Sequence, residues 1–194
     1  MWTRLALTNN SKERPSKGLL ARLRKDTRGS SAIEFAVVGA PFLLFVTSII
    51  GYGLYFFSTT ALEFGVETAS RQVRTGQAQT SGLTRSGFKQ LICNAAGGAI
   101  DCSDAKVKVH IQSAANWAGI TPIPCLASGS LSSSAGSGTD AISGPAGGAS
   151  QAVLVTVCYE WTLAQSMPFL VLGNMGNGSS VIQAAATFKT EPYQ

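Results

Sequence analysis

The chain has 194 residues, of which 45% are apolar, enough for the core of one compact domain and too many for a fully disordered chain. Charged residues make up only 13%, and the net charge of +5 raises the question of an anionic partner such as nucleic acid or a lipid surface. The positive charges are concentrated at the N-terminus, and this position favours a lipid surface over nucleic acid.

Residues 1–28 carry eight basic side chains against Glu13 and Asp26, so this segment holds a net charge of +6 and the rest of the chain −1. A basic segment directly before an apolar run is typical of the cytoplasmic side of a membrane span and is attracted to anionic lipid. A disordered nucleic-acid-binding arm is the alternative, and we expect no nucleic acid partner. The basic residues are Arg4, Lys12, Arg14, Lys17, Arg22, Arg24, Lys25 and Arg28.

Residues 35–62 form a run of 28 residues without a charge. Because a helix crosses a bilayer core with about 20 apolar residues, the run predicts one transmembrane helix. Two alternatives fit this run less well. A helix buried in a soluble protein would show a polar stripe, and a cleaved secretory signal would have an apolar region of only about 7 to 15 residues before its cleavage site. Pro41, Gly51 and Gly53 predict a bent but unbroken helix.

After the apolar run the pattern becomes amphipathic, with Phe64, Val66, Ala69 and Val73 separated by charged residues. This spacing predicts that the helix continues beyond the membrane as one element. A stop at residues 75–76, Thr followed by Gly, completes a helix over 30–76.

Downstream, the periodicity predicts an α+β domain with a small antiparallel sheet over residues 77–194. In the strand at 106–112 we expect Val107, Val109 and Ile111 to face the core and His110, with the lysines, to face water. The segment 127–151, rich in Ser, Gly and Ala, predicts a flexible loop. The other expected elements are a helix at 86–95, a strand at 152–161, a helical turn at 163–170, a turn at 173–178 and a strand at 181–189.

All four cysteines follow the apolar run, which favours an oxidising compartment and up to two disulfides. Of the three possible pairings we favour Cys93 with Cys102 and Cys125 with Cys158. A metal site is the alternative, but the chain has no C-x-x-C motif and only one histidine.

Glu34 stands at the head of the apolar run. A carboxylate deep in a bilayer costs roughly 2.5 to 3.5 kcal/mol, so it requires a partner and indicates a function. The alternative places Glu34 at the level of the lipid headgroups beside Arg28, where the cost is small.

The residues around Glu34 resemble a known processing site. Gly29 lies five residues before Glu34, between the basic leader and the apolar helix, as in type IV prepilins and pseudopilins. The form G-x-x-x-x-E-F, with Pro41 six residues after Phe35, is similar to the TadE/TadF group of pilin-like proteins from the Tad (Flp) pilus system. Further similar segments are 69–71 with 75–77, 91–93 and 186–193, and the resemblance covers about residues 25–112 and 150–194.

The resemblance implies cleavage after Gly29 by a prepilin peptidase, which would expose the amine of Ser30. Glu34 would then pair with the terminal amine of a neighbouring subunit, which would leave neither charge alone in a low dielectric. Phe35 and Pro41 would belong to the same subunit-contact region. Ser30 departs from the pattern of many type IV pilins, which have Phe at this position. The chain is also longer than a major Flp pilin, and this length implies a minor, assembly-type component.

The expected protein is therefore a minor pseudopilin with a pilin-like fold: a cytoplasmic leader (1–29), a membrane helix (30–76) and a periplasmic domain (77–194). It would sit in the bacterial inner membrane as a single-pass protein, be processed by the prepilin peptidase, and act by contact with other Tad pilus and pseudopilin subunits, without catalysis and without a cofactor. One alternative is an unprocessed, single-pass periplasmic binding or scaffold module, and another is a membrane-tethered enzyme.

The residues give the enzyme little support. His110 is the only histidine, Asp101 and Asp104 suit a turn around Cys102, and the Gly-rich segment 173–178 lacks the lysine of a phosphate-binding loop.

Overall fold

The computed structural model describes residues 29–133, 141–142, 144 and 146–192. The chain divides into two compact units, one up to Val46 and one from Thr47 onward. Residues 1–28 of the expected basic leader (1–29) lie outside the described residues.

Helix α2 (Ser30–Arg74) is 45 residues long and contains the whole charge-free run. Pro41 lies inside it and does not break it, as the sequence predicts. The most apolar 18-residue window of α2 is entirely unburied, and its length and composition fit a single-pass membrane protein. The helix ends at the predicted position, where Gly76 adopts a left-handed φ of 77°.

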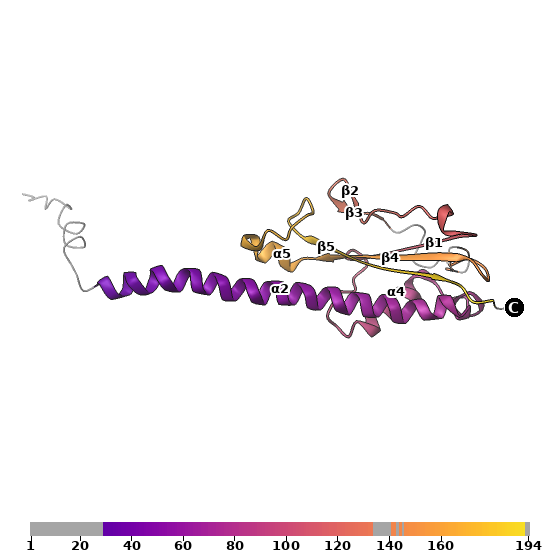
Figure 1. Cartoon of the computed structure of the whole chain (residues 1–194), viewed down its shortest axis with the longest axis horizontal. Helices are drawn as coiled ribbons and strands as arrows, with labels where there is room; N and C mark the ends of the chain where they lie inside the picture. The colour runs from indigo at the N-terminus through magenta and orange to yellow at the C-terminus, as the bar shows by residue number, and fades with distance from the viewer. Residues whose placement is uncertain (1–28, 134–140, 143, 145, 193–194) are drawn as a thin grey trace, which may run out of the picture. The chain divides into compact units, whose positions relative to one another are not determined.

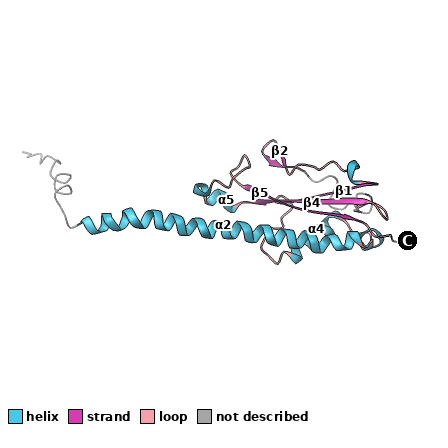
Figure 2. Cartoon of the chain, in the orientation of Figure 1, coloured by secondary structure: helices cyan, strands magenta, loops and turns pink. Residues whose placement is uncertain are grey.

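The second unit is an α+β domain, as predicted. Its sheet has the strand order β1-β4-β5, and both pairings are antiparallel (Figures 1 and 2). The strands are β1 (Val107–Ala114), β4 (Ala152–Trp161) and β5 (Ser180–Lys189). The shorter elements are α3 (Gln77–Thr80), α4 (Arg85–Ala95), η2 (Trp117–Gly119), β2 (Leu126–Ala127), β3 (Ser130–Leu131), α5 (Leu163–Ser166) and η3 (Pro168–Leu170).

One face of the sheet packs on α2 and α4 and forms the core. Because side chains alternate along a strand, the odd-numbered residues of β1 and β4 point to this face together. The buried cluster joins them to the apolar stripe of α2 and to Phe88 and Ile92 of α4. The sheet residues of the cluster are Val107, Val109, Ile111, Val153, Val155, Val157, Tyr159, Trp161, Ile182 and Ala184, and the α2 residues are Leu62, Val66, Ala69 and Val73.

The opposite face of the sheet is also covered, which the sequence did not indicate. The short hairpin β2–β3 is antiparallel, and the disulfide between Cys125 and Cys158 ties its start to β4. His110, which we expected to face water, is only 1% exposed. The alternation in β1 was assigned correctly, but the assumption that its second face is open was wrong.

The interpretation of residues 127–151 as a flexible loop was also incomplete. Ile142 and Ala146 are fully buried and belong to the core cluster. The Ile142 amide donates to the Leu83 carbonyl at 2.9 Å, so this part of the segment is fastened to the residues before α4. Residues 134–140, 143 and 145 lie outside the described part.

Candidate functional site

The predicted processing and contact residues all lie at the start of α2. Gly29 directly precedes the first helical residue, Ser30, and Glu34 follows one turn later on the same helix. Phe35 is 79% exposed although it is a large apolar side chain. A helix start that displays a carboxylate beside bare aromatic surface is suited to contact with lipid or with another apolar helix.

Apolar exposure continues along α2 to about residue 57. A soluble protein rarely leaves a contiguous apolar surface of this size uncovered, so the surface indicates a membrane or protein contact. The exposed large apolar residues of this stretch are Ile33, Phe35, Val37, Val38, Phe42, Leu43, Leu44, Phe45, Ile49, Ile50, Tyr52, Leu54, Phe56 and Phe57.

From Gly51 onward, one side of α2 is covered by its own domain. The space that a Cβ atom at Gly51 would occupy is taken by the Leu170 side chain, with the Met167 sulfur 3.0 Å away. The Tyr52 hydroxyl donates to the Leu170 carbonyl at 3.3 Å. One turn later the rings of Tyr55 and Trp161 meet edge to face, with centroids 5.4 Å apart.

The same docking continues to the end of the helix. The Ser58 hydroxyl donates to the Ala99 carbonyl at 3.4 Å. A Cβ at Gly65 would lie 2.7 Å from the Ile92 carbonyl oxygen, so only a residue without a side chain permits the approach of α2 to α4 here. The guanidinium of Arg74 pairs with Glu191 at 3.5 Å. The helix is therefore a lipid-suited surface at its start and a structural part of the domain at its end.

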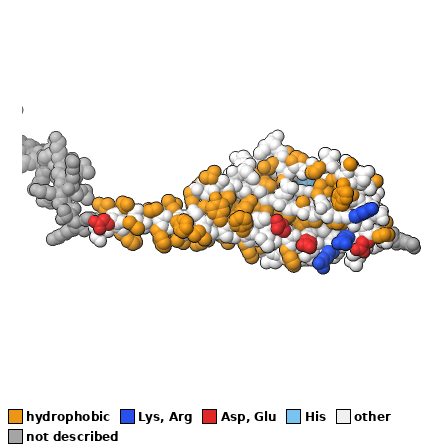
Figure 3. Space-filling model, in the orientation of Figure 1, with side chains coloured by type: hydrophobic (Ala, Val, Ile, Leu, Met, Phe, Trp, Pro, Cys, Tyr) orange, Lys and Arg blue, Asp and Glu red, His pale blue; other side chains and the backbone are white. Residues whose placement is uncertain are grey.

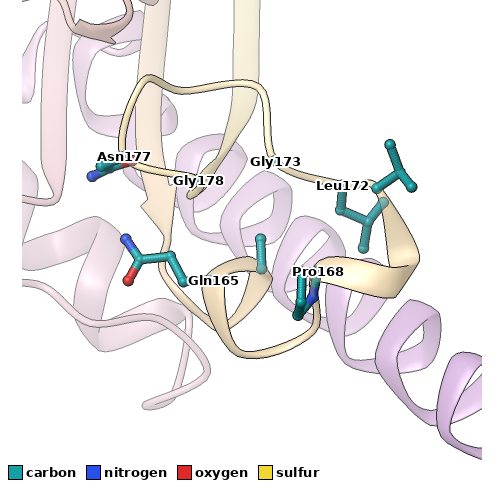
Figure 4. A pocket seen from close by; sticks show the side chains of 8 residues that line it. Gln165, Pro168, Leu172, Gly173, Asn177 and Gly178 are labelled. Carbon is teal, nitrogen blue, oxygen red and sulfur yellow. The ribbon is translucent and has the colours of Figure 1, made fainter.

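The segment 162–172, which contains α5 and η3 and is called the tip from here on, lines a pocket of about 320 Å³. Figure 4 shows the Gln165, Pro168 and Leu172 side chains around it, closed on one side by the turn of Gly173 to Gly178. None of the lining residues is charged, so the pocket has no side chain that could act as a general acid or base at neutral pH.

Val171 at the tip has a left-handed backbone, with φ 52° and ψ 36°, and its side chain is 86% exposed. A β-branched residue rarely adopts this conformation, which costs roughly 1 to 2 kcal/mol relative to the right-handed region. The surrounding turn thus holds an apolar side chain outward in a strained conformation. The sequence prediction of a helical turn at 163–170 was correct, but it did not identify this residue.

Both disulfides lie in the second unit and use all four cysteines. Cys93 is bonded to Cys102 and Cys125 to Cys158, with Cα atoms 6.0 and 5.5 Å apart. This is the pairing that the sequence favoured. Within the described residues, no group of three or more His, Cys, Asp or Glu side chains is placed to hold a metal ion.

Charged residues surround the loop that the Cys93 disulfide closes. Asp101 accepts a hydrogen bond from the Lys106 ammonium at 2.7 Å and another from the Ser103 amide at 3.1 Å, which completes the predicted Asx-type turn. These two bonds, chiefly the one from Lys106, lower the pKa of Asp101. Lys89 likewise pairs with Asp104 and lowers its pKa. Both carboxylates are therefore ionised at neutral pH.

His110 is buried in β1 opposite Thr156 of β4. Neither ring nitrogen has a hydrogen-bond partner among the residues that the structure describes. Burial, together with the nearby Arg85 guanidinium, lowers the pKa of the imidazole. His110 is only 1% exposed, so its environment is that of a neutral core residue.

The start of α2 is also where a known family matches. Residues 29–71 match the family model described as TadE-like protein. The match begins at Gly29, includes Glu34, Phe35 and Pro41, and covers most of α2, in agreement with the resemblance that the sequence predicts. The matched segment is therefore TadE-like, and the TadE-like family is a family of pilus components that is not known as enzymatic. No curated protein and no solved structure gives a significant match to the chain.

Proposed function

We propose that this protein is a minor pseudopilin of the Tad pilus machinery, anchored in the inner membrane with its α+β domain in the periplasm. It acts by contact with other pilus subunits and not by catalysis. The TadE-like match over residues 29–71 carries the proposal, because it covers the segment in which the processing and contact residues lie.

Cleavage after Gly29 is the first step of the proposed function. The bond between Gly29 and Ser30 lies at the start of α2, at the boundary between the basic leader and the apolar helix. Removal of the leader by a prepilin peptidase would place a terminal amine at Ser30, one helical turn from Glu34.

Pairing through Glu34 is the second step. The carboxylate of one subunit would bind the Ser30 amine of a neighbour, and the exposed apolar side chains after it, beginning with Phe35, would pack between the two helices. Pro41 would shape this contact, since it lacks an amide donor within the helix. A charge-assisted pair away from water has the strength to set the register of one helix against another.

The periplasmic placement of the domain has separate support. The six net positive charges before the span favour retention of the N-terminus in the cytoplasm. Both disulfides follow the span, and such bonds persist in an oxidising compartment.

Co-purification tests the role of Glu34. In cells that carry a Tad system, Glu34→Ala should insert into the membrane like the wild type but recover roughly tenfold less of the partner subunits, the effect of losing about 1.5 kcal/mol. Glu63→Ala is the matched control, since Glu63 is an exposed carboxylate on the same helix just after the charge-free run. Equal recovery of partners with both variants would overturn the pairing role.

A further inference from the structure

The tip of the domain has the composition of a membrane-contacting surface. Residues 161–188 contain no charged side chain, a run as long as the charge-free part of α2. Within this run the tip exposes Leu163 to 46%, Phe169 to 46% and Val171 to 86%. In Figure 3 the apolar surface around α5 adjoins that of the neighbouring part of α2, whereas the visible Lys and Arg side chains gather at the opposite end of the domain.

Contacts with α2 fix the level of the tip along that helix. Leu170 and Met167 lie against Gly51, and the Tyr52 hydroxyl binds the Leu170 carbonyl. A helix that starts its span at Phe35 needs about 20 residues, or about 30 Å, to cross the bilayer core. Gly51 and Tyr52 therefore fall in the last turn of the span, and the tip lies at the depth of the membrane surface.

Charged side chains begin just beyond that level. Ser58 binds the carbonyl of Ala99, two residues before Asp101 in the chain. Asp101 pairs with Lys106, whose carbonyl accepts the Glu160 amide at 2.8 Å. This charged belt, Asp101 and Lys106, lies near the level of Ser58, about two helical turns past Gly51, so it would stay in water while the tip does not. The Glu160 carboxylate lies nearer the tip, where it accepts hydrogen bonds from Asn177 at 2.7 Å and Ser179 at 2.8 Å.

Aromatic residues occupy the boundary between the tip and the charged belt. Tyr52 of α2, which is 42% exposed, and the half-buried Tyr55 lie there, and Tyr55 packs edge to face on Trp161, which is buried in the core. Tyr and Trp are enriched at the level of lipid headgroups because one end of each ring system is apolar and the other polar.

We propose that the tip inserts into the headgroup and acyl boundary of the leaflet that faces the domain, with Phe169 and Val171 in contact with lipid. The strained backbone of Val171 fits this role, because it holds an apolar side chain away from the domain. The tip and the part of α2 at Gly51 and Tyr52 thus form two adjacent membrane contacts within the second unit. The proposal rests on α2 spanning the membrane and on neither leader cleavage nor pairing through Glu34.

Site-specific photo-cross-linking in the full-length protein, reconstituted in phospholipid vesicles, tests the insertion. The photoreactive residue p-benzoylphenylalanine replaces Phe169 in one sample and Val171 in a second. The control replaces Trp117 of η2, which is 53% exposed and follows the end of β1 that points away from the tip. Mass spectrometry of the irradiated protein identifies the adducts.

We expect phospholipid adducts at position 169 or 171 and no phospholipid adduct at position 117. No lipid adduct at either tip position, or cross-links from the tip to a second copy of the chain, would overturn the proposal. Equal lipid labelling at 169 and 117 would overturn it too, because it would mean that the tip has no preference for the membrane. The two tip positions keep the test decisive if one variant does not fold.

Discussion

The two ends of α2 have the same secondary structure and opposite surroundings. Up to Ile50 its large apolar side chains are exposed, whereas from Gly51 to Val73 one side of the helix is buried under its own domain. After Glu34, the next charge is Glu63, so the first part of the docked end is as free of charge as the exposed end. One helix can therefore serve both as a membrane element and as a core element. Its first part is apolar on all sides, and its last part is apolar on one side only.

The largest expected effect on stability comes from removing a disulfide, and it concerns only the domain on which the end of α2 is docked. Cys125→Ser with Cys158→Ser removes a disulfide that spans 33 residues and fastens the second face of the sheet, so the free energy of unfolding of the domain should fall by about 3 to 4 kcal/mol. The bond between Cys93 and Cys102 spans only 9 residues, and its loss should cost about 2 to 3 kcal/mol. Denaturant unfolding of the purified full chain in detergent measures both.

Membrane insertion should be unchanged in both cysteine variants, since every cysteine follows the span. A larger loss from the shorter loop would contradict the account of the second face.

Two glycines on the same helix give a sharper comparison. Gly65→Ala places a methyl group 2.7 Å from the Ile92 carbonyl oxygen, a backbone atom that cannot move aside alone, so the domain should lose about 1 to 3 kcal/mol of stability. Gly53→Ala meets no atom within 4 Å and should be neutral or gain up to about 1 kcal/mol from helix propensity. Thermal unfolding monitored by circular dichroism compares the two, and equal effects would mean that α2 and α4 are not in close contact.

The smallest expected effect concerns pH. Burial lowers the pKa of His110, so below about pH 6.5, the pKa of an exposed histidine, the unfolded chain binds a proton that the folded chain does not. The stability of the domain should therefore fall as the pH decreases through this range and level off once the folded state also binds the proton. Urea unfolding at pH 7.5, 6.5 and 5.5 follows the change, and His110→Leu should remove most of it. An unchanged pH dependence in that variant would place the responsible group elsewhere.

Local patterns predicted much of this fold. Thr75 and Gly76 predicted the stop of the long helix, which the structure ends at Arg74, and the β-branched run predicted β4 with its bounds, Ala152–Trp161. The burial of His110 could not be read from the alternation in β1, because period-two spacing separates two faces but does not say what covers each of them. β2 and β3 have two residues each, too few for a periodic signal, and Ile142 and Ala146 lie in a segment whose composition resembles a spacer.

The candidate site likewise has a part that the sequence predicted and a part that it did not. Gly29, Glu34, Phe35 and Pro41 were identified because their spacing is local and resembles a family motif. The tip was missed, although the lack of charge over residues 161–188 is visible in the sequence. Only the contact of Leu170 with Gly51 places that segment at the end of the span.

The central claim is that the start of α2 is a processed, partner-seeking element and its end a structural one. Intact-mass spectrometry of the non-reduced protein, extracted from membranes of cells with an active prepilin peptidase, tests it most directly. The account predicts a mature chain that begins at Ser30 and carries two disulfides. A chain that keeps its native leader would contradict the account and would favour an unprocessed, membrane-anchored binding module.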